Sequence, residues 1–379
     1  MKVVLIMNSE NNRPVWLEIN LNNLEYNFNQ IKKSVSQETL IMAIVKANAY
    51  GHGAKPVVSR LIKSGCDRLG VAIPEEGIKL REENVLLPIH VLGEVLTEQI
   101  PDIMNYNLIP TVSKMQTVKF INQFAKEKGI KKKVHVKIDT GMGRIGVLTE
   151  NAVEFIKSVN KYSNIKIEGL FSHFADADNS DKSYTYQQWN KFNEILKQLR
   201  KKKINIPLCH IANSATIIDL QEMQMDMVRP GIMLFGLKPS FDVNNISLKP
   251  VLSWKTKIVY LKQVPAGTGI SYGITYKTKN KAEVATLPLG YADGYSRLLS
   301  NKAEVLIKGK RVPVIGNICM DQFMIDVTDV KVNEGDEVIL IGEQNNEKIT
   351  ADEIANLMGT INYEVICGIN DRVPRVYKC

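Results

Sequence analysis

The chain is poor in the residues that build disulfide frameworks and metal centres. Its 379 residues include 5 cysteines and 5 histidines. The cysteines, at positions 66, 209, 319, 367 and 379, are odd in number and widely spaced, with no C-x-x-C pair. This pattern indicates reduced thiols in a cytosolic protein rather than a disulfide scaffold. No H-x-H or H-E-x-x-H motif occurs, so we expect no metal site.

Long apolar runs are also missing. No run in the sequence approaches the roughly 18 residues that a membrane helix needs. Residues 1–12 hold one lysine and only six apolar residues before Asn8, which is too short for a secretory signal. We therefore expect a cytoplasmic protein with no membrane segment.

Basic residues are in modest excess. Lysine and arginine number 49 against 40 acidic residues, a net charge of +9 that permits binding to polyanions. The basic residues are mostly scattered, and the short runs at 131–133 and 200–203 lie where helices should end. We therefore expect no nucleic-acid partner. With 44% hydrophobic and 23% charged residues the chain is globular, and its length predicts about two domains.

From about residue 40 to 236, short apolar runs alternate with amphipathic stretches such as Tyr186–Lys202, where apolar residues recur every 3 or 4 positions. Strands of this kind alternating with helices predict a parallel sheet covered by helices. Eight such strands predict an α/β fold, specifically a (β/α)8 TIM-like barrel. We expect this barrel, with an N-terminal strand, over residues 1–244. An open doubly wound sheet is the alternative, but no G-x-G-x-x-G follows the first strand. The eight runs are Ile41–Val45, Leu69–Ile73, Ile89–Leu92, Leu108–Val112, Val134–Ile138, Ile165–Phe171, Leu208–Ile211 and Val228–Phe235.

The helical period fades after Pro239, and residues 245–379 predict a second, mainly β C-terminal domain. One short helix, Ala351–Leu357, interrupts it, and residues 307–310 predict a hairpin turn. The early strand Val15–Ile19 could pair with either domain. The expected C-terminal strands are Lys255–Gln263, Glu283–Pro288, Ala303–Ile307, Arg311–Ile315, Phe323–Val327 and Glu337–Ile341.

Polar residues collect where the barrel strands end, which is where this fold builds active sites. Lys46 directly follows an apolar run, so partial burial should lower the pKa of its amine, as a Schiff-base lysine requires. Ser214 and Gly231-Ile232 follow the last two strands, where the fold often binds phosphate. A lysine for imine chemistry opposite a phosphate site suggests pyridoxal 5′-phosphate. Each residue also has a simpler interpretation. Lys46 could extend its amine to solvent, Ser214 could be a helix N-cap, and Gly231 could be a turn glycine.

Further polar residues are more ambiguous. Arg144 and Arg229 are candidates for contacts to an anion or a ring, with surface ion pairs as the alternative. His173 could be catalytic or a buried, hydrogen-bonded histidine. The segments 271–273, 290–295 and 318–321 look like β-turns with aromatic packing, although a tyrosine such as Tyr272 can act in acid–base catalysis.

The segment Ala43–Gly53 (AIVKANAYGHG) resembles the cofactor-lysine signature of alanine racemases. The resemblance runs along nearly the whole chain, from Trp16–Ile19 to Arg372–Arg375. Its motifs in between are Lys137–Arg144, Phe171–Phe174, Asn213-Ser214, Val228–Gly231, Ser271–Gly273, Gly290–Gly294, Cys319–Gln322 and Thr360–Val365.

The resemblance implies a pyridoxal-phosphate-dependent isomerase that interconverts L- and D-alanine and supplies D-alanine for peptidoglycan. It implies a barrel with a C-terminal β domain, and a head-to-tail homodimer whose active sites are shared between subunits. By position, Lys46 would carry the cofactor and act as one acid–base group, with Tyr272 of the partner subunit as the other.

The remaining roles come from the same resemblance. Arg229 would face the pyridine nitrogen with His173 hydrogen-bonded behind it, and Arg144 would contact the phenolic oxygen and the substrate. Residues expected at the cofactor phosphate or beside it are Tyr50, Asn213, Ser214, Gly231, Ile232 and Tyr363.

Four further positions complete the expected site. Met320 of the partner subunit would contact the substrate carboxylate, Tyr291 would narrow the entrance, and Asp321 would lie near the catalytic tyrosine. Lys137 matches a position often carbamylated in the family, where the carbamate orients Arg144.

The chain departs from the family at one notable position, and three rival functions stay open. Asn317 stands where many relatives carry arginine, at the entrance corridor. A related decarboxylase would have a glycine triplet and a glutamate facing the ring nitrogen, and this chain has neither. The second rival is a racemase of serine or another amino acid, and the third is a non-catalytic pyridoxal-phosphate-binding protein.

Overall fold

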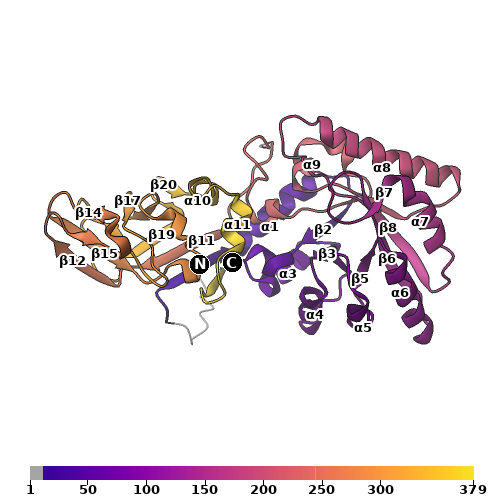
Figure 1. The fold of residues 1–379 in the computed structure, drawn as a ribbon, viewed down its shortest axis with the longest axis horizontal. Helices are drawn as coiled ribbons and strands as arrows, with labels where there is room; N and C mark the ends of the chain where they lie inside the picture. The colour runs from indigo at the N-terminus through magenta and orange to yellow at the C-terminus, as the bar shows by residue number, and fades with distance from the viewer. Residues whose placement is uncertain (1–11, 244) are drawn as a thin grey trace. The chain divides into compact units, whose positions relative to one another are not determined.

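The computed structural model describes residues 12–243 and 245–379, which divide into two compact units (Figure 1). The barrel unit comprises Leu24–Ala49 and Ala54–Lys249. The β unit comprises the described residues up to Asn23, the short segment Tyr50–Gly53, and Pro250–Cys379. The division that we expected after residue 244 thus falls after Lys249. Residues 1–11, where the sequence argues against a secretory signal, lie outside the described residues.

The strands of the barrel unit are parallel and lie in the order β10-β2-β3-β4-β5-β6-β8-β9. Between the two end strands, Asp226 N donates to Cys209 O (3.2 Å) and Arg229 N donates to Ala212 O (3.1 Å). The strands therefore surround a common interior, and the predicted barrel is confirmed. Their bounds are β2 Leu40–Ile44, β3 Arg68–Val71, β4 Ile89–Val91, β5 Ile109–Val112, β6 Lys132–Asp139, β8 Ile165–Phe171, β9 Leu208–His210 and β10 Met227–Val228, with β7 Val147–Leu148 paired to β6.

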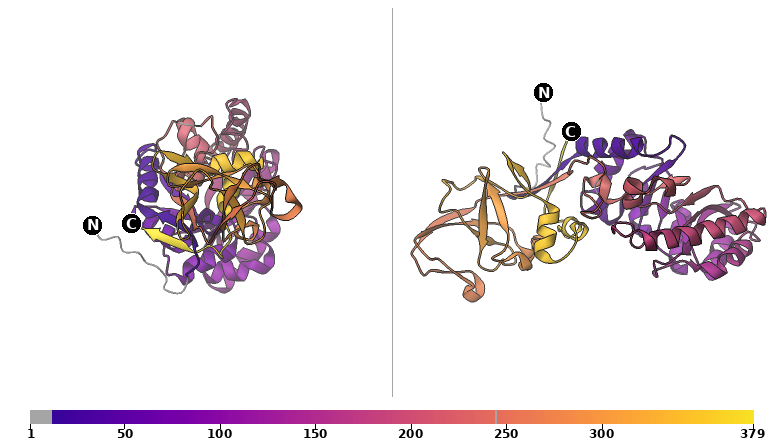
Figure 2. Two further views of the ribbon diagram at one scale, coloured as in Figure 1. Left: turned by 90° about the vertical axis from the view of Figure 1, so that its left-hand side faces the viewer. Right: turned by 90° about the horizontal axis from the view of Figure 1, so that it is seen from above.

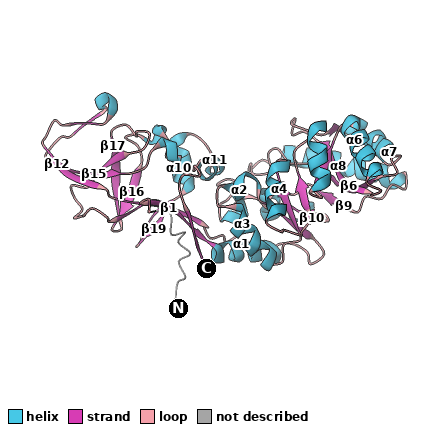
Figure 3. Ribbon diagram, turned by 90° about the horizontal axis from the view of Figure 1, so that it is seen from below, coloured by secondary structure: helices cyan, strands magenta, loops and turns pink. Residues whose placement is uncertain are grey.

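Helices surround these strands in the barrel unit (Figures 2 and 3). The predicted helix at 186–202 is α8, which buries Phe192, Ile195 and Leu199 on one face, as its spacing indicates. Among the described residues, no helix is both long and apolar enough to cross a membrane. The helices are α1 Leu21–Lys33, α2 Lys46–Tyr50, α3 Ala54–Lys63, α4 Pro74–Glu82, α5 Ile100–Asn105, α6 Met115–Glu127, α7 Ala152–Val159, α8 Ser183–Lys201 and α9 Ser214–Asp219, with short 3₁₀ turns at 97–99, 149–151 and 221–223.

One predicted barrel strand is wrong over most of its length. The run Val228–Phe235 is extended only in β10, Met227–Val228, and Ile232–Phe235 then form a 3₁₀ helix. Pro230 cannot donate a ladder hydrogen bond, so the strand ends before it. Residues 232–235 are all buried, and a buried apolar run has no periodicity that separates strand from helix.

The β unit contains a sheet in the order β12-β15-β18-β17-β16-β19-β11-β1-β21, with β20 paired to β19. The predicted hairpin is confirmed, since β16 and β17 pair with Ile307 opposite Lys310. Strand bounds are β1 Val15–Asn20, β11 Leu252–Lys257, β12 Tyr260–Val264, β13 Gly269–Ile270, β14 Tyr276–Lys277, β15 Ala282–Leu287, β16 Glu304–Ile307, β17 Lys310–Ile315, β18 Phe323–Asp326, β19 Glu337–Gln344, β20 Glu347–Ile349 and β21 Arg375–Lys378; the helices are α10 Ala351–Met358 and α11 Asn362–Cys367, with 3₁₀ turns at 272–274, 291–293 and 297–299.

Three expectations for this unit need correction. Strand β1, which we had grouped with the barrel, pairs antiparallel with β11 and parallel with β21, both in the β unit. The stretch that we read as one strand, Lys255–Gln263, is split into β11 and β12 at Ile258-Val259. Helix α11 is additional to the single helix that the sequence predicts.

Candidate active site

The segment labelled α2, Lys46–Tyr50, is not a right-handed helix, because the backbone after Lys46 forms a left-handed turn. The φ angles of Ala47–Tyr50 lie between 51° and 55°, a conformation that costs a residue with a side chain roughly 1–2 kcal/mol. Two side chains hold this turn: Glu76 Oε1 accepts from Ala47 N (2.6 Å) and Asn48 Oδ1 accepts from Ala54 N (2.8 Å). Because such strain persists only where the surroundings fix it, Lys46 stands at the start of a rigid turn after β2.

Arg229 is buried at the barrel rim among hydrogen-bond acceptors. Its guanidinium donates to His210 Nδ1 (2.8 Å), His173 Nδ1 (3.1 Å), Ser172 O (2.8 Å) and Ile211 O (2.9 Å). The expected contact to His173 is therefore present. Burial, together with the charge of Arg144, lowers the pKa of Arg229 to about 9, so the guanidinium stays charged at neutral pH. Two of its nitrogens are thereby fixed in direction by the barrel.

Lys137 is a lysine of the barrel unit whose amine is buried without a hydrogen-bond partner among the described residues. Its Nζ lies 4.7 Å from the ring centroid of Phe171. Burial, and then the charges of Arg229 and Arg144, lower the pKa of Lys137 well below its usual range. The lowered pKa favours the neutral, nucleophilic form of this amine over its charged form.

A hydroxyl and backbone N–H groups meet at the ends of the last two strands. Ser214 Oγ accepts from Gly231 N (3.0 Å), and Ile232 opens the buried 3₁₀ turn that follows. The N-cap of α9 is Asn213 rather than Ser214, because Asn213 Oδ1 accepts from Thr216 N (3.2 Å). The Asn213 side chain is thus used for capping, and the Ser214 hydroxyl is the polar group that this corner offers to an anion.

Two tyrosines that we expect at the phosphate belong to the β unit. Tyr50 and Tyr363 lie side by side, with ring centroids 6.2 Å apart. Tyr50 is buried and Tyr363 is half-buried. The turn after Lys46 therefore carries the chain from the barrel unit into the β unit within four residues.

The three turn motifs of the β unit converge. Tyr291 N donates to Cys319 O (3.1 Å) and Ala292 N donates to Met320 O (3.0 Å), which joins the second motif to the third. Asn317 Nδ2 donates to the carbonyl of Tyr272 (2.7 Å), which joins the first. Three large side chains of these motifs are exposed, by 72% for Tyr272, 53% for Met320 and 42% for Tyr291.

Asp321 belongs to an ionic network in the same unit. It pairs with Arg372 (2.8 Å), which also approaches the buried carboxylate of Asp293 (3.2 Å). Arg13 pairs with that carboxylate from the N-terminal segment (2.7 Å). Asp321 is thereby tied to the interior of the β unit.

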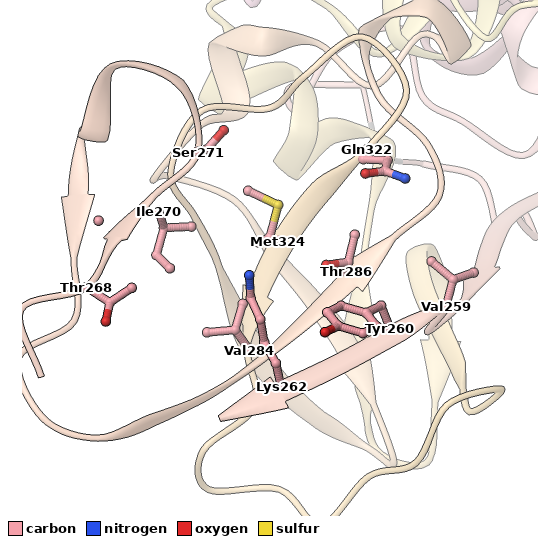
Figure 4. A pocket seen from close by; sticks show the side chains of 11 residues that line it. Val259, Tyr260, Lys262, Thr268, Ile270, Ser271, Val284, Thr286, Gln322 and Met324 are labelled. Atoms are coloured by element: carbon pink, nitrogen blue, oxygen red, sulfur yellow. The ribbon is translucent and has the colours of Figure 1, made fainter. Parts of the chain in front are cut away.

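A cavity of about 450 Å³ opens beside Ser271 in the β unit (Figure 4). Its floor is formed by β12, β15 and β18, with Lys262, Val284 and Met324 among the lining side chains. The cavity contains neither Lys46 nor Arg229, which belong to the barrel unit. The candidate active site is therefore the group of polar residues at the barrel strand ends and not this cavity.

The sequence reasoning missed a hydrogen-bonded chain behind Arg229. His210 Nε2 lies 2.9 Å from His135 Nδ1, and His135 Nε2 lies 3.2 Å from Glu168 Oε2. Glu168 also pairs with Arg68 (2.7 Å) and Lys133 (2.8 Å). Burial raises the pKa of Glu168, but hydrogen bonds from His135, Arg68 and Lys133 outweigh it and hold that pKa well below its usual range.

The residues at the two ends of this series of hydrogen bonds, Arg229 and Glu168, decide which atom donates in each bond. An arginine only donates, so His210 Nδ1 accepts and its proton sits on Nε2. That N–H donates to His135 Nδ1, so His135 carries its proton on Nε2 and donates to Glu168. Burial lowers the pKa of both rings, which keeps them neutral. Histidines on buried strands β6 and β9 were the available signal, since a buried imidazole needs partners.

A metal ion would compete with these hydrogen bonds for the ring nitrogens of the histidines. Ligand atoms of His90, His135 and His210 lie within 4.8 Å of one another. Both ring nitrogens of His135 and His210 are already engaged, however, by Arg229, by Glu168 and by each other. The arrangement therefore fits a hydrogen-bonded support for Arg229 rather than a metal centre.

Comparisons with known proteins agree with this geometry. Residues 19–239 match the alanine racemase N-terminal domain family, and residues 251–377 match the alanine racemase C-terminal domain family. The chain is 58% identical over 374 residues to the alanine racemase of Halothermothrix orenii, covering 98% of this chain and 99% of that protein.

Solved structures extend the likeness to the fold. The alanine racemase of Clostridium difficile 630 superposes with a TM-score of 0.92 at 44% identity, covering 97% of this chain and 96% of that one. A histidine racemase from Leuconostoc mesenteroides superposes with a TM-score of 0.89 at 28% identity, covering 97% and 98%. Matches to both domain families across almost the whole length place the chain in the alanine racemase family.

Proposed function

We propose that the protein interconverts L- and D-alanine with pyridoxal 5′-phosphate, and that Lys46 and Tyr272 are its two acid–base groups. The reaction supplies D-alanine for peptidoglycan. The observation that carries the proposal is the buried Arg229, a donor-only cation held in the barrel at the strand ends where Lys46 and Ser214 also lie. Coupled assays of D-alanine formation from L-alanine test it.

The residues present fit the cofactor. A phosphate needs N–H and hydroxyl donors, and the Ser214 hydroxyl and the backbone of Ile232 lie at one corner of the barrel unit, where Gly231 N already donates to Ser214 Oγ (3.0 Å). By the family resemblance, Tyr50 and Tyr363 would also bind the phosphate. Arg229 would face the pyridine nitrogen, and Arg144 the phenolic oxygen. Lys46 would hold the cofactor until the substrate amine takes its place, and pyridoxal phosphate would then supply an electron sink that acidifies the α-proton of the substrate.

Racemisation requires proton transfer on both faces of the α-carbon. One side chain cannot easily reach both faces, so Lys46 would exchange the proton on the D-alanine face and Tyr272 on the L-alanine face. Met320 would contact the substrate carboxylate, while Tyr291 narrows the entrance. Asp321, held by Arg372 (2.8 Å), would lie near Tyr272.

Arg229 would set the reaction type. Its pKa of about 9 keeps it charged at neutral pH, and as a donor it would hydrogen-bond the ring nitrogen without easily protonating it. The ring would then be a weaker electron sink than it would be beside a carboxylate. This limits transamination and disfavours the decarboxylase alternative, in which a glutamate faces the ring nitrogen.

The main alternative to this proposal concerns which amino acid is the substrate. A racemase for serine or another amino acid would share the barrel, Lys46 and Tyr272. A panel of L-amino acids, assayed for α-proton exchange in deuterated buffer, separates these substrates. We expect alanine to exchange fastest, and a faster exchange with serine or histidine would reassign the substrate.

We also propose a homodimer in which the barrel unit of one subunit and the β unit of the other form each site. The exposure of Tyr272, Met320 and Tyr291 supports this, because large side chains left exposed together commonly mark a surface that a partner covers. The free thiols of the buried Cys66 and Cys209 are consistent with a cytoplasmic enzyme. Cell fractionation tests the location.

Mixing two inactive variants tests the shared sites. Lys46→Ala and Tyr272→Ala subunits, exchanged and reassociated, should regain roughly a quarter of the wild-type activity, because half of the random dimers are mixed and each mixed dimer has one intact site. Each variant mixed with itself is the control. No recovery, with subunit exchange verified by mass, would contradict the shared site.

Lys137 should form a carbamate. A neutral buried amine adds CO2 and releases one proton, and the resulting anion would lie close to Arg144 and Arg229, whose charges act on Lys137. Protein equilibrated with ¹³CO2 should show one carbamate resonance that disappears in Lys137→Met. Lys132→Met, which removes a buried lysine with a pKa of about 8, should retain the resonance. A signal that survives in Lys137→Met would assign the carbamate elsewhere.

A further inference from the structure

We infer that Asn317 is a positioning residue for Tyr272, acting as a clamp on the loop that carries it. The inference rests on the proposed role of Tyr272 in proton transfer. Asn317 Nδ2 donates to the carbonyl oxygen of Tyr272 (2.7 Å), and the carbonyl of Asn317 accepts from Ser271 Oγ (2.5 Å). The two segments are 45 residues apart along the chain and bind each other reciprocally.

The loop cannot hold its shape by itself. Ser271 has φ 63° and ψ −178°, a combination found almost only in glycine, and Ile274 has φ 50°. Residues with side chains pay roughly 1–3 kcal/mol for such conformations, which persist only where the surroundings enforce them. The loop is therefore held by its neighbours, and the hydrogen bonds to Asn317 lie directly at the strained residues.

Side-chain packing does not place Tyr272 either. Its side chain is 72% exposed within this chain, and residues 272–275 are all exposed. Within one subunit the position of the phenol is therefore set by its backbone, whatever the partner adds, and the amide of Asn317 reaches that backbone at the carbonyl of Tyr272 itself. Loss of this amide frees the residue whose hydroxyl must meet the substrate.

The segment that carries Asn317 is itself anchored. Gly316 N donates to Asn301 Oδ1 (2.6 Å), and Asn301 Nδ2 donates to Thr275 Oγ1 at the far end of the loop (3.0 Å). A Cβ added at Gly316 would lie 2.7 Å from Ile270 O, so the two segments touch through a glycine. This close approach brings Asn317 within reach of Tyr272. Asn317, which we expected to act at the entrance, is thus also part of the scaffold of the loop.

The test measures α-proton exchange from each enantiomer of alanine in deuterated buffer, with holoenzyme variants. Asn317→Asp keeps the shape but loses the donor, and Asn317→Ala removes the side chain. We expect exchange from L-alanine to fall by up to about 100-fold, the cost of an ångström-scale misplacement of a reacting group. Exchange from D-alanine, which uses Lys46, should change much less. Asn345→Asp makes the same charge change on the β19–β20 hairpin and should alter neither.

The outcomes separate this inference from the proposed function. Equal slowing of both exchanges by Asn317→Ala, or no slowing, overturns the clamp if Tyr272→Phe is asymmetric in the same assay. If Tyr272→Phe is itself symmetric, the role of Tyr272 fails first. Should Asn317→Asp not fold, as judged by circular dichroism, Asn317→Ala carries the same comparison.

Discussion

Replacing Lys46 with alanine should reduce racemisation by at least about 10²–10⁴-fold, the usual contribution of a positioned acid–base group. The loss should be larger still if Lys46 also holds the cofactor covalently. The purified holoenzyme should then lose the visible absorption band of the bound cofactor. The left-handed turn at Ala47–Tyr50 should survive, because its hydrogen bonds come from Glu76 and Asn48.

Lys55→Ala is the matched control for this change. Lys55 is an exposed lysine in the next helix, paired with Glu83 at the surface, and such pairs contribute little to stability. We expect its spectrum and activity to equal those of the wild type. An unchanged visible band in Lys46→Ala would refute the assignment of Lys46 as the cofactor lysine.

Replacing Tyr272 with phenylalanine should slow racemisation in both directions by about 10²–10⁴-fold. The substitution removes one hydroxyl and leaves the ring. Net racemisation needs one proton removed and one returned on opposite faces, so loss of either group blocks both directions. Because an enzyme cannot shift the equilibrium, the two rates must fall together.

Tyr260→Phe provides the control for the loss of a hydroxyl. Tyr260 is an exposed tyrosine of the same unit, on β12 and outside the proposed machinery. Its racemisation rate should match that of the wild type, and circular dichroism of both variants should show an intact fold. A Tyr272→Phe enzyme with the wild-type rate would remove Tyr272 from the mechanism.

Much of the fold could be predicted from patterns that are local in the chain. The barrel strands were recognisable because each is a short buried run next to an amphipathic helix, and the spacing of apolar residues in α8 indicated its buried face. The prediction for Val228–Phe235 was wrong because buried residues alone do not distinguish a strand from a 3₁₀ turn. The partner of β1 could not be predicted, since its neighbours β11 and β21 lie more than 200 residues away in sequence.

The candidate site could likewise be predicted where the signal is local in the sequence and not where it depends on distant segments. Lys46, Ser214 and Arg229 lie at strand ends, and the rule that barrel sites form there brings them together. The support behind Arg229 was missed because His210, His135 and Glu168 come from three different strands, and only their hydrogen bonds reveal the chain. Asn317 was noticed for its position, but its link to Tyr272 depends on backbone angles that no residue pattern encodes.

The most direct test of the two-base account is α-proton exchange by Tyr272→Phe in deuterated buffer, measured separately for each enantiomer. Lys46 alone can remove the α-proton of D-alanine and return a deuteron to the same face, so D-alanine should still exchange. L-alanine, whose α-proton Tyr272 would remove in this account, should exchange far more slowly. Equal suppression of exchange from both enantiomers would contradict the account.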